Sequence, residues 1–292
     1  MKGSIYMREY VILTDSGADL PIEVATRYGI GVVDLVVQIG NESKLNGEVN
    51  ASEFYAILRE KTPVTTSAVN MQRFKDFFEG YLKAGKDVLY LGFSSGLSAT
   101  FTAGRNAAEE VSSAYPDRRI LAVDTLSASL GQGLLVTLTA KKKEAGATLD
   151  EAYAFAAENR LHLCHWFTVD DLFFLKRGGR VSAATAVLGT MLAIKPFMHV
   201  DNEGHLVNVA KVRGRRASVD AMFDKLTETA LSPEGQLYYI CHGDCIEDAE
   251  YLSARIKEKY PESEVMIGYT GAVIGAHSGP GTLALFFLGT ER

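Results

Sequence analysis

The sequence has 292 residues, of which 47% are hydrophobic and 23% are charged, and its formal net charge is −6 at pH 7. This length allows one large or two modest domains, and the composition is typical of a globular protein with a sizeable core. The negative charge argues against nucleic acid as the main partner, because phosphate binding requires an excess of basic residues. Three cysteines, Cys164, Cys241 and Cys245, are too few for a disulfide framework, which favours a cytoplasmic location.

Strands and helices alternate through the first half of the chain. The series begins with a buried strand at residues 10–14 and a helix at 21–28. Further strands are predicted at residues 32–39, 87–93 and 120–123, and further helices at 52–61, 71–84, 100–115, 127–145 and 149–161. Alternation at this spacing predicts parallel βαβ units, and therefore a doubly wound parallel sheet in an N-terminal domain over residues 1–160.

The second half of the chain has a different pattern. Apolar runs at residues 197–200 and 206–212 flank Asp201-Asn202-Glu203-Gly204, which is a hairpin turn signature. The remaining predicted strands are 163–169, 237–241, 264–269, 273–277 and 282–288, and the predicted helices are 171–177, 182–194, 215–231 and 246–260. The antiparallel hairpin predicts a second, mixed α/β domain over residues 161–292. No apolar run has the length of a membrane span, so we expect no stable membrane insertion.

The most informative stretch follows the strand at residues 87–93. It reads Ser94-Ser95-Gly96-Leu97-Ser98-Ala99-Thr100, and a helix begins at its end. Open α/β sheets bind ligands where a strand ends in such a loop. Hydroxyl groups and free backbone N–H groups at a helix start suit an anion. A helix start that binds no ligand is the alternative for this stretch.

Three other patches carry polar groups that suit a binding site. Thr65-Thr66-Ser67 is a hydroxyl-rich link, for which a simple turn cluster is the alternative. His277 is expected at the end of a strand and is followed by Ser278-Gly279-Pro280-Gly281. Two basic groups, around residues 176–180 and 211–216, form either a solvated face or a docking surface for an anion or a partner protein.

The order of these segments resembles the DegV family, including the fatty-acid-binding subunit of bacterial fatty acid kinase. The likeness runs through VILTDSGADLP, TTS, SSGLSATF, AVDTLSASLGQG, LKRGGRVS, IKP and GAHSGPG, and so covers nearly the whole chain. It implies a long-chain fatty acid bound between the two domains as the only ligand, with no cofactor and no metal. The residues that it implies for the carboxylate site are Thr66, Ser67, Ser98, Ala99 and His277.

The resemblance also implies a partner. The fatty acid is presented to a separate kinase subunit that forms the acyl phosphate, and Arg180 and Arg213 match positions for docking that kinase. The sequence GxxxxGK[ST] of an ATP-binding loop is absent, which favours a binding subunit without its own ATP site. Candidates for the acyl tunnel are apolar residues, for each of which an ordinary core position is the alternative. They are Phe167, Phe173, Phe174, Leu188, Met191, Leu192, Phe197 and Ile274.

The sequence departs from the family pattern at three places. Ala68-Val69 stands where Gln-Pro is usual, Ala99 replaces a glycine, and Ser278 replaces a threonine. A side chain at residue 99 keeps the backbone N–H group but limits the backbone conformations that are available. We therefore expect these departures to affect the geometry of the loops more than the class of ligand.

Two other functions fit parts of the sequence. Gly92-Phe93-Ser94-Ser95-Gly96 matches the nucleophile elbow of a serine hydrolase, with His277 and either Asp244 or Asp248 completing a triad. A metal site is the weaker alternative. Its candidate ligands lie in the segments 162–165 and 241–245, which begin in predicted strands, where adjacent side chains point to opposite faces.

Overall fold

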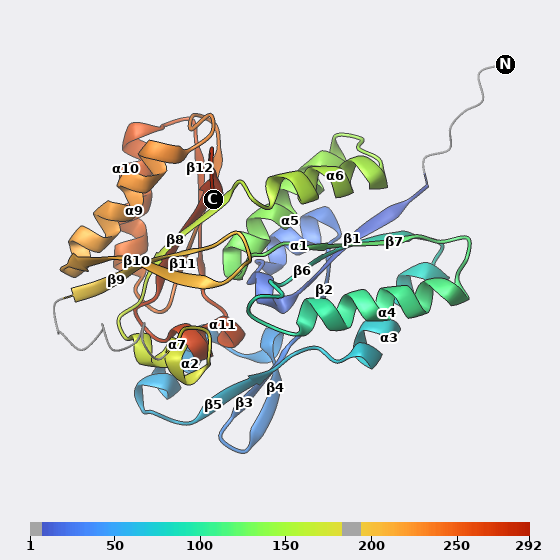
Figure 1. Cartoon of the computed structure of the whole chain (residues 1–292), viewed down its shortest axis with the longest axis horizontal. Coiled ribbons are helices and arrows are strands. Elements are labelled where there is room, and N and C mark those ends of the chain that lie inside the picture. Colours follow the sequence, from blue (N-terminus) through green and yellow to red (C-terminus); the bar gives the residue numbers. More distant parts are fainter. Residues whose placement is uncertain (1–7, 183–193) are drawn as a thin grey trace.

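A parallel sheet of four strands, in the order β2-β1-β6-β7, forms from the N-terminal part of the chain. The computed structural model describes residues 8–182 and 194–292 (Figure 1). The strands of this sheet are β1 (Tyr10–Asp15), β2 (Gly31–Val33), β6 (Asp87–Gly92) and β7 (Ile120–Asp124). β1 and β6 are buried along their whole lengths. Their continuous apolar sequences are those of strands covered on both faces.

Helices cover both faces of this sheet. Within β1, Val11 and Leu13 belong to the core beneath α3 and α4, whereas Tyr10 and Ile12 belong to the core beneath α1, α5 and α6. This division follows from the alternation of side chains along a strand. The helices are α1 (Ile22–Tyr28), α3 (Met71–Lys83), α4 (Thr100–Ala114), α5 (Ser129–Glu144) and α6 (Leu149–Asn159). The predicted doubly wound parallel sheet is confirmed.

A second, antiparallel sheet of three strands has the order β4-β3-β5. The prediction of a single strand over residues 32–39 was wrong. At residues 34 and 35 the chain leaves the parallel sheet, because the Leu35 N–H group donates to Ser16 Oγ and the Asp34 carboxylate accepts from the Gly47 N–H group. The elements of this region are η1 (Ser16–Ala18), β3 (Val36–Ile39), β4 (Glu42–Leu45), η2 (Asn46–Glu48), α2 (Ala51–Arg59) and β5 (Val64–Ser67).

The C-terminal part of the chain forms a mixed sheet of six strands, in the order β10-β9-β8-β13-β11-β12. Its neighbouring strands are antiparallel except β11 and β12, which are parallel. The predicted hairpin is confirmed, since β9 and β10 pair antiparallel on either side of residues 201–205, with a register shift between Asn208 and Ala210. The strands are β8 (Leu163–Thr168), β9 (Ile194–Val200), β10 (Leu206–Arg213), β11 (Leu237–His242), β12 (Glu264–Tyr269) and β13 (Leu283–Leu288). The helices of this part are α7 (Leu172–Arg177), α9 (Arg215–Thr229), α10 (Ile246–Lys259) and α11 (Ala272–Ser278).

Residues 273–277 lie in the helix α11, so the predicted strand there was wrong. The apolar, β-branched residues of this segment suggest a strand when they are read locally. The structure instead begins a helix, and the Val273 N–H group near its start donates to Asn46 Oδ1 over 3.0 Å. A capping partner 227 residues away in the sequence leaves no signal in the local pattern.

Helix α5 lies between the parallel sheet and the mixed sheet (Figure 1). Its residues are buried almost all round, which identifies it as a central helix rather than a surface helix. Leu130, Leu134 and Leu135 pack into the core of the mixed sheet, whereas Val136 and Ala140 pack against the parallel sheet. The two parts of the chain therefore share a core, and a domain boundary at residue 160 stays a prediction.

The start of α6 offers a test of the local signals in the sequence. Thr148 and Glu151 form a capping box, in which Thr148 Oγ1 accepts from the Glu151 N–H group over 3.3 Å. Replacing Thr148 with Ala should lower the free energy of unfolding by about 1 kcal/mol, because a helix N–H group loses its partner. Urea unfolding of the variant measures this change, and an unchanged midpoint would contradict the assignment.

Candidate functional site

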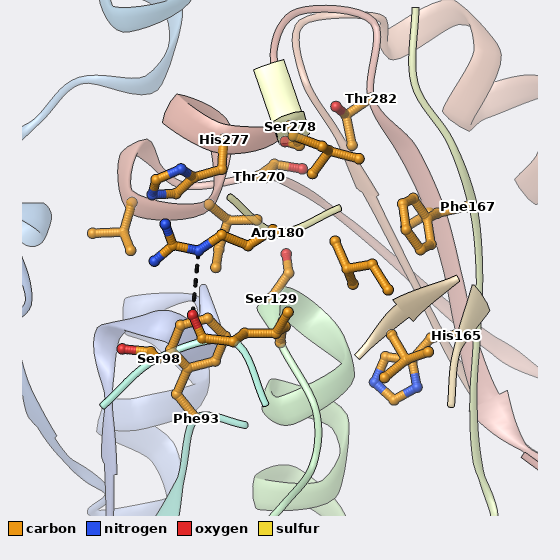
Figure 2. Close-up of a pocket in the computed structure, with 18 of the residues that line it drawn as sticks. Phe93, Ser98, Ser129, His165, Phe167, Arg180, Thr270, His277, Ser278 and Thr282 are labelled. Carbon is orange, nitrogen blue, oxygen red and sulfur yellow. Dashed lines mark hydrogen bonds between the residues drawn. The ribbon is translucent and has the colours of Figure 1, made fainter. Parts of the chain in front are cut away.

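A cavity of about 520 Å³ lies where the three sheets meet. Its walls come from the loop after β6, the start of α5, strands β8 and β13, and helix α11 (Figure 2). This position is at the carboxyl end of β6, as expected for a ligand site in an open α/β sheet. The apolar lining residues are Leu35, Ala68, Phe93, Leu97, Ala99, Ala128, Phe167, Leu175, Val200, Leu206, Val273, Ile274, Ala284 and Phe286.

His277 is held in one wall of the cavity by α11. Its Nε2 atom lies 2.7 Å from Thr66 Oγ1, which comes from β5 of the small sheet. Burial, together with the positive charges of Arg180 and Arg177, lowers the pKa of His277 to about 4. The imidazole is therefore neutral at physiological pH in the ligand-free protein. Two residues that are 211 positions apart in the sequence thus form one polar group.

Ser98 and Ala99 lie in the same cavity, at the start of α4. Ser98 Oγ accepts from the Thr100 N–H group over 3.2 Å and lies 2.9 Å from Thr100 Oγ1. Within residues 8–182 and 194–292, no acceptor pairs with the N–H group of Ala99. The positive end of the α4 dipole is directed at this point, so the loop provides a hydroxyl group and a free N–H group for an anion.

Arg180 brings a positive charge into the cavity (Figure 2). Its Nε atom donates to the Leu97 carbonyl oxygen over 3.2 Å, and Nη1 donates to the Gly178 carbonyl oxygen. Burial lowers the pKa of its guanidinium group. Among the described residues no carboxylate pairs with it, although half-buried charges usually have a partner. The cavity therefore carries a positive charge without a matching negative charge.

Some residues predicted for the site lie elsewhere. Ser67 ends β5 with an exposed side chain and does not line the cavity. Arg180, which the resemblance implies for partner docking, lines the cavity, whereas Arg213 is exposed at the end of β10.

Of the residues predicted for the acyl tunnel, some line the cavity and others lie elsewhere. Phe167 and Ile274 line the cavity. Phe173 is 58% exposed, and Phe174 packs beside the N-terminal core with the Arg177 guanidinium over its ring. Phe197 stacks on Trp166 in a different core. Leu188, Met191 and Leu192 lie outside the described residues.

The sequence interpretation missed several polar residues of the cavity wall. They come from the start of α5, from β8, β11 and α11, and from the loops on either side of α11. Ser129 and Ser278 lie in segments that carry the family resemblance, and His165 and Cys241 lie in the segments considered for a metal site, but none was predicted to line the cavity. These residues are Ser129, His165, Cys241, Thr270, Ser278 and Thr282. Of these residues, Ser129 is the one that the sequence could have indicated, because it follows a strand and a loop at the start of a helix, as Ser98 does.

The geometry does not favour the hydrolase alternative. Ser94 is fully buried, and its hydroxyl group donates to the Gly204 carbonyl oxygen over 2.9 Å. His277 pairs with Thr66 instead of Ser94, and Asp248 pairs with Arg215 over 2.8 Å. Asp244 forms an ion pair with Arg59. Each member of the suggested triad therefore has another partner.

The metal-site alternative finds no support in the described residues. Among residues 8–182 and 194–292, no three His, Cys, Asp or Glu side chains gather in a way that would hold a metal ion. In the same part of the chain, no helix is both long enough and apolar enough to cross a bilayer.

Comparison with known proteins shows which family the chain belongs to. The sequence model described as "Uncharacterised protein, DegV family" matches residues 9–290. A DegV domain-containing protein of Clostridium perfringens is 46% identical over 289 residues, which are 98% of this chain and 99% of the relative. This chain belongs to the DegV family.

Solved structures of DegV proteins share the fold. A fatty-acid-binding DegV family protein from Thermus thermophilus matches 96% of this chain and 99% of its own length, with a TM-score of 0.85 and 30% identity. A Thermotoga maritima protein whose structure revealed a fatty-acid-binding function matches 96% of this chain and 99% of its own, with a TM-score of 0.80 and 30% identity. DegV, a fatty-acid-binding protein from Bacillus subtilis, matches 96% of this chain and 98% of its own, with a TM-score of 0.84 and 28% identity.

The electrostatics of His277 predict a pH dependence of stability. Its pKa is about 4 in the folded protein, against an ordinary value of 6.5. The unfolded chain therefore binds more protons between these two pH values, and the free energy of unfolding should fall as the pH decreases through this window. An NMR titration of the ligand-free protein should give a midpoint for the His277 ring near 4. A midpoint at the ordinary value would contradict the burial of this side chain.

Proposed function

We propose that this DegV protein binds one long-chain fatty acid in the cavity and presents its carboxylate to a partner fatty acid kinase in the cytoplasm. The observation that carries the proposal is the unmatched charge of Arg180 in a cavity whose lining is otherwise mostly apolar. A fatty acid supplies both the missing negative charge and an apolar chain. The DegV structures described as fatty-acid-binding, at 30% identity, support the same class of ligand.

The carboxylate site consists of Thr66, Ser98, Ala99, His277 and Arg180 in this proposal. Thr66 and His277 share a hydrogen bond and keep one hydrogen for the ligand. With the Ser98 hydroxyl group, the Ala99 N–H group and the Arg180 guanidinium group, they provide enough donors for both carboxylate oxygens. His277 is neutral in the empty cavity, so one of its ring nitrogens carries a hydrogen to donate. Ser67 is left out because its side chain does not line the cavity.

The acyl chain packs against the apolar walls, including Phe167 and Ile274. Each buried CH₂ group contributes roughly 0.8 kcal/mol, so a long chain gains on the order of 10 kcal/mol before the losses of binding entropy. The chain therefore supplies most of the affinity, and the polar groups decide which end of the ligand lies beside Arg180. The proposed domain boundary near residue 160 would place the ligand between the two parts of the chain.

Mass spectrometry of an organic extract from the purified protein tests the function. We expect about one long-chain fatty acid per chain, released only when the protein unfolds. A protein that carries no lipid and takes up no octadecanoate when it is offered would overturn the proposal. A fluorophosphonate probe adds a second readout, since labelling of Ser94 would favour a hydrolase.

The partner kinase belongs to the proposal as a separate step. Arg213 is exposed at the end of β10 and lies outside the cavity lining, so it is available to a protein partner. Replacing Arg213 with Glu should leave fatty acid binding unchanged and slow acyl-phosphate formation by a fatty acid kinase. Lys211→Glu, on the same strand, is a control for the general loss of positive charge. Equal rates for wild type and the Arg213 variant would remove this residue from the docking surface.

A further inference from the structure

A second polar region of the cavity wall consists of groups outside the proposed carboxylate site. It contains Ser129 at the start of α5, Thr270 after β12, Cys241 in β11, Ser278 in α11 and His165 in β8. Figure 2 shows Ser129 between the side that carries Arg180 and Ser98 and the side that carries Phe167 and His165. An unsubstituted hydrocarbon chain would cover these polar atoms without bonding to any of them.

The hydroxyl groups of Ser129 and Thr270 already donate their hydrogens. Ser129 Oγ donates to the Asp19 carboxylate over 2.5 Å, and Thr270 Oγ1 donates to Cys241 Sγ over 3.1 Å. Each hydroxyl oxygen keeps lone pairs that accept hydrogen bonds. Ser129 also has a φ of 52°, a left-handed conformation that is uncommon outside glycine and that holds its side chain at this position.

His165 presents another acceptor without a donor. Its Nδ1 atom lies 2.8 Å from the Leu163 carbonyl oxygen, which can only accept, so Nδ1 carries the hydrogen. Nε2 is then a bare acceptor in the neutral ring, and it has no partner among the described residues although His165 is only 2% exposed. The Ser278 hydroxyl group, on a residue that is 5% exposed, likewise lacks a partner in this part of the chain.

We infer that this second polar region binds a hydroxyl group carried by the acyl chain, so that the protein favours hydroxylated fatty acids over unsubstituted ones. The region offers acceptors to a ligand O–H group, and the start of α5 adds backbone N–H groups that suit the ligand oxygen. A second carboxylate fits less well, because it can only accept hydrogen bonds and this region mainly offers acceptors. This inference rests on the proposed fatty acid site and narrows its ligand.

Competitive binding tests the inference with octadecanoate and a series of hydroxyoctadecanoates that differ in the position of the hydroxyl group. At least one isomer should bind the wild-type protein about 5- to 10-fold more tightly than octadecanoate, as one net hydrogen bond allows. Ser129→Ala and Thr270→Val should each remove this preference while leaving octadecanoate affinity within about threefold of wild type. Thr139→Val is the matched control, because it removes a hydroxyl group from α5 that is buried away from the cavity.

The outcomes separate the two proposals. If octadecanoate binds tightly and every hydroxylated isomer binds equally or more weakly, the hydroxyl site is overturned and the fatty acid site stands. A preference that survives in both variants would also overturn the assignment to this region. If neither class of acid binds, the proposed function fails and the inference fails with it.

Discussion

Replacing Arg180 with Gln is expected to weaken octadecanoate binding by about 10- to 100-fold, the effect of losing a charge-assisted hydrogen bond in a partly buried site. The guanidinium group is half-buried and has no carboxylate partner in the described part of the chain. Gln keeps a donor for the Leu97 carbonyl oxygen but removes the charge. Isothermal titration at low salt measures the change directly.

The control for this variant is Arg213→Gln, which removes an exposed charge outside the cavity. It should bind octadecanoate as wild type does. A second readout is the titration of His277, whose pKa should rise in the Arg180 variant, because the charge of Arg180 helps to lower it. Unchanged binding together with an unchanged His277 pKa would show that Arg180 does not face the ligand.

Replacing Gly131 with Ala is expected to destabilise the fold by about 2 kcal/mol or more, since overpacking in a rigid core has costs of this size. A Cβ atom at this position in α5 would lie 2.4 Å from His165 Nε2 and 2.8 Å from Phe286 Cδ1. Both neighbours are buried side chains of the mixed sheet that also line the cavity, so they have to move toward it to admit the methyl group. Denaturant unfolding, with the slope of the transition checked for two-state behaviour, measures the loss.

Gly80→Ala provides the matched control for this prediction. Gly80 lies in α3, and a Cβ atom there would meet nothing within 4 Å. The same substitution should therefore stabilise the protein by about 0.5–1 kcal/mol, because glycine loses more backbone entropy in a helix. If both variants gain stability equally, the neighbours of Gly131 accommodate the added methyl group, and the close approach of α5 to the mixed sheet does not limit this substitution.

The parts of the fold that were predictable from sequence depend on local patterns. The alternation of apolar runs along the N-terminal half predicted the parallel sheet, and Asp201-Asn202-Glu203-Gly204 predicted the hairpin. The parts of the fold that were predicted wrongly depend on long-range contacts. The start of α11 depends on Asn46, and the chain leaves the parallel sheet at Leu35 through a bond to Ser16.

The candidate site shows the same division. Ser98 and Ala99 follow a strand and start a helix, so their position was predictable from neighbouring residues. Phe167 and Phe197 lie in adjacent antiparallel strands, where Phe167 pairs with Met198 and shares its face. Phe197 therefore faces the opposite side, in the core with Trp166. The sequence contains both strands but not their register, so it does not show which phenylalanine reaches the cavity.

The burial of α5 between two sheets makes the local stability of this helix depend on whether the cavity holds a ligand. The first residues of this helix border the cavity, and its remaining turns are packed against both halves of the chain. A ligand that fills the cavity packs against α5. When the ligand leaves, the helix that both halves of the chain share loses these contacts. We expect amide hydrogens in the first turns of α5 to exchange with solvent faster after the lipid is removed. The ligand-bound and ligand-free proteins would then differ in the local stability of a buried helix.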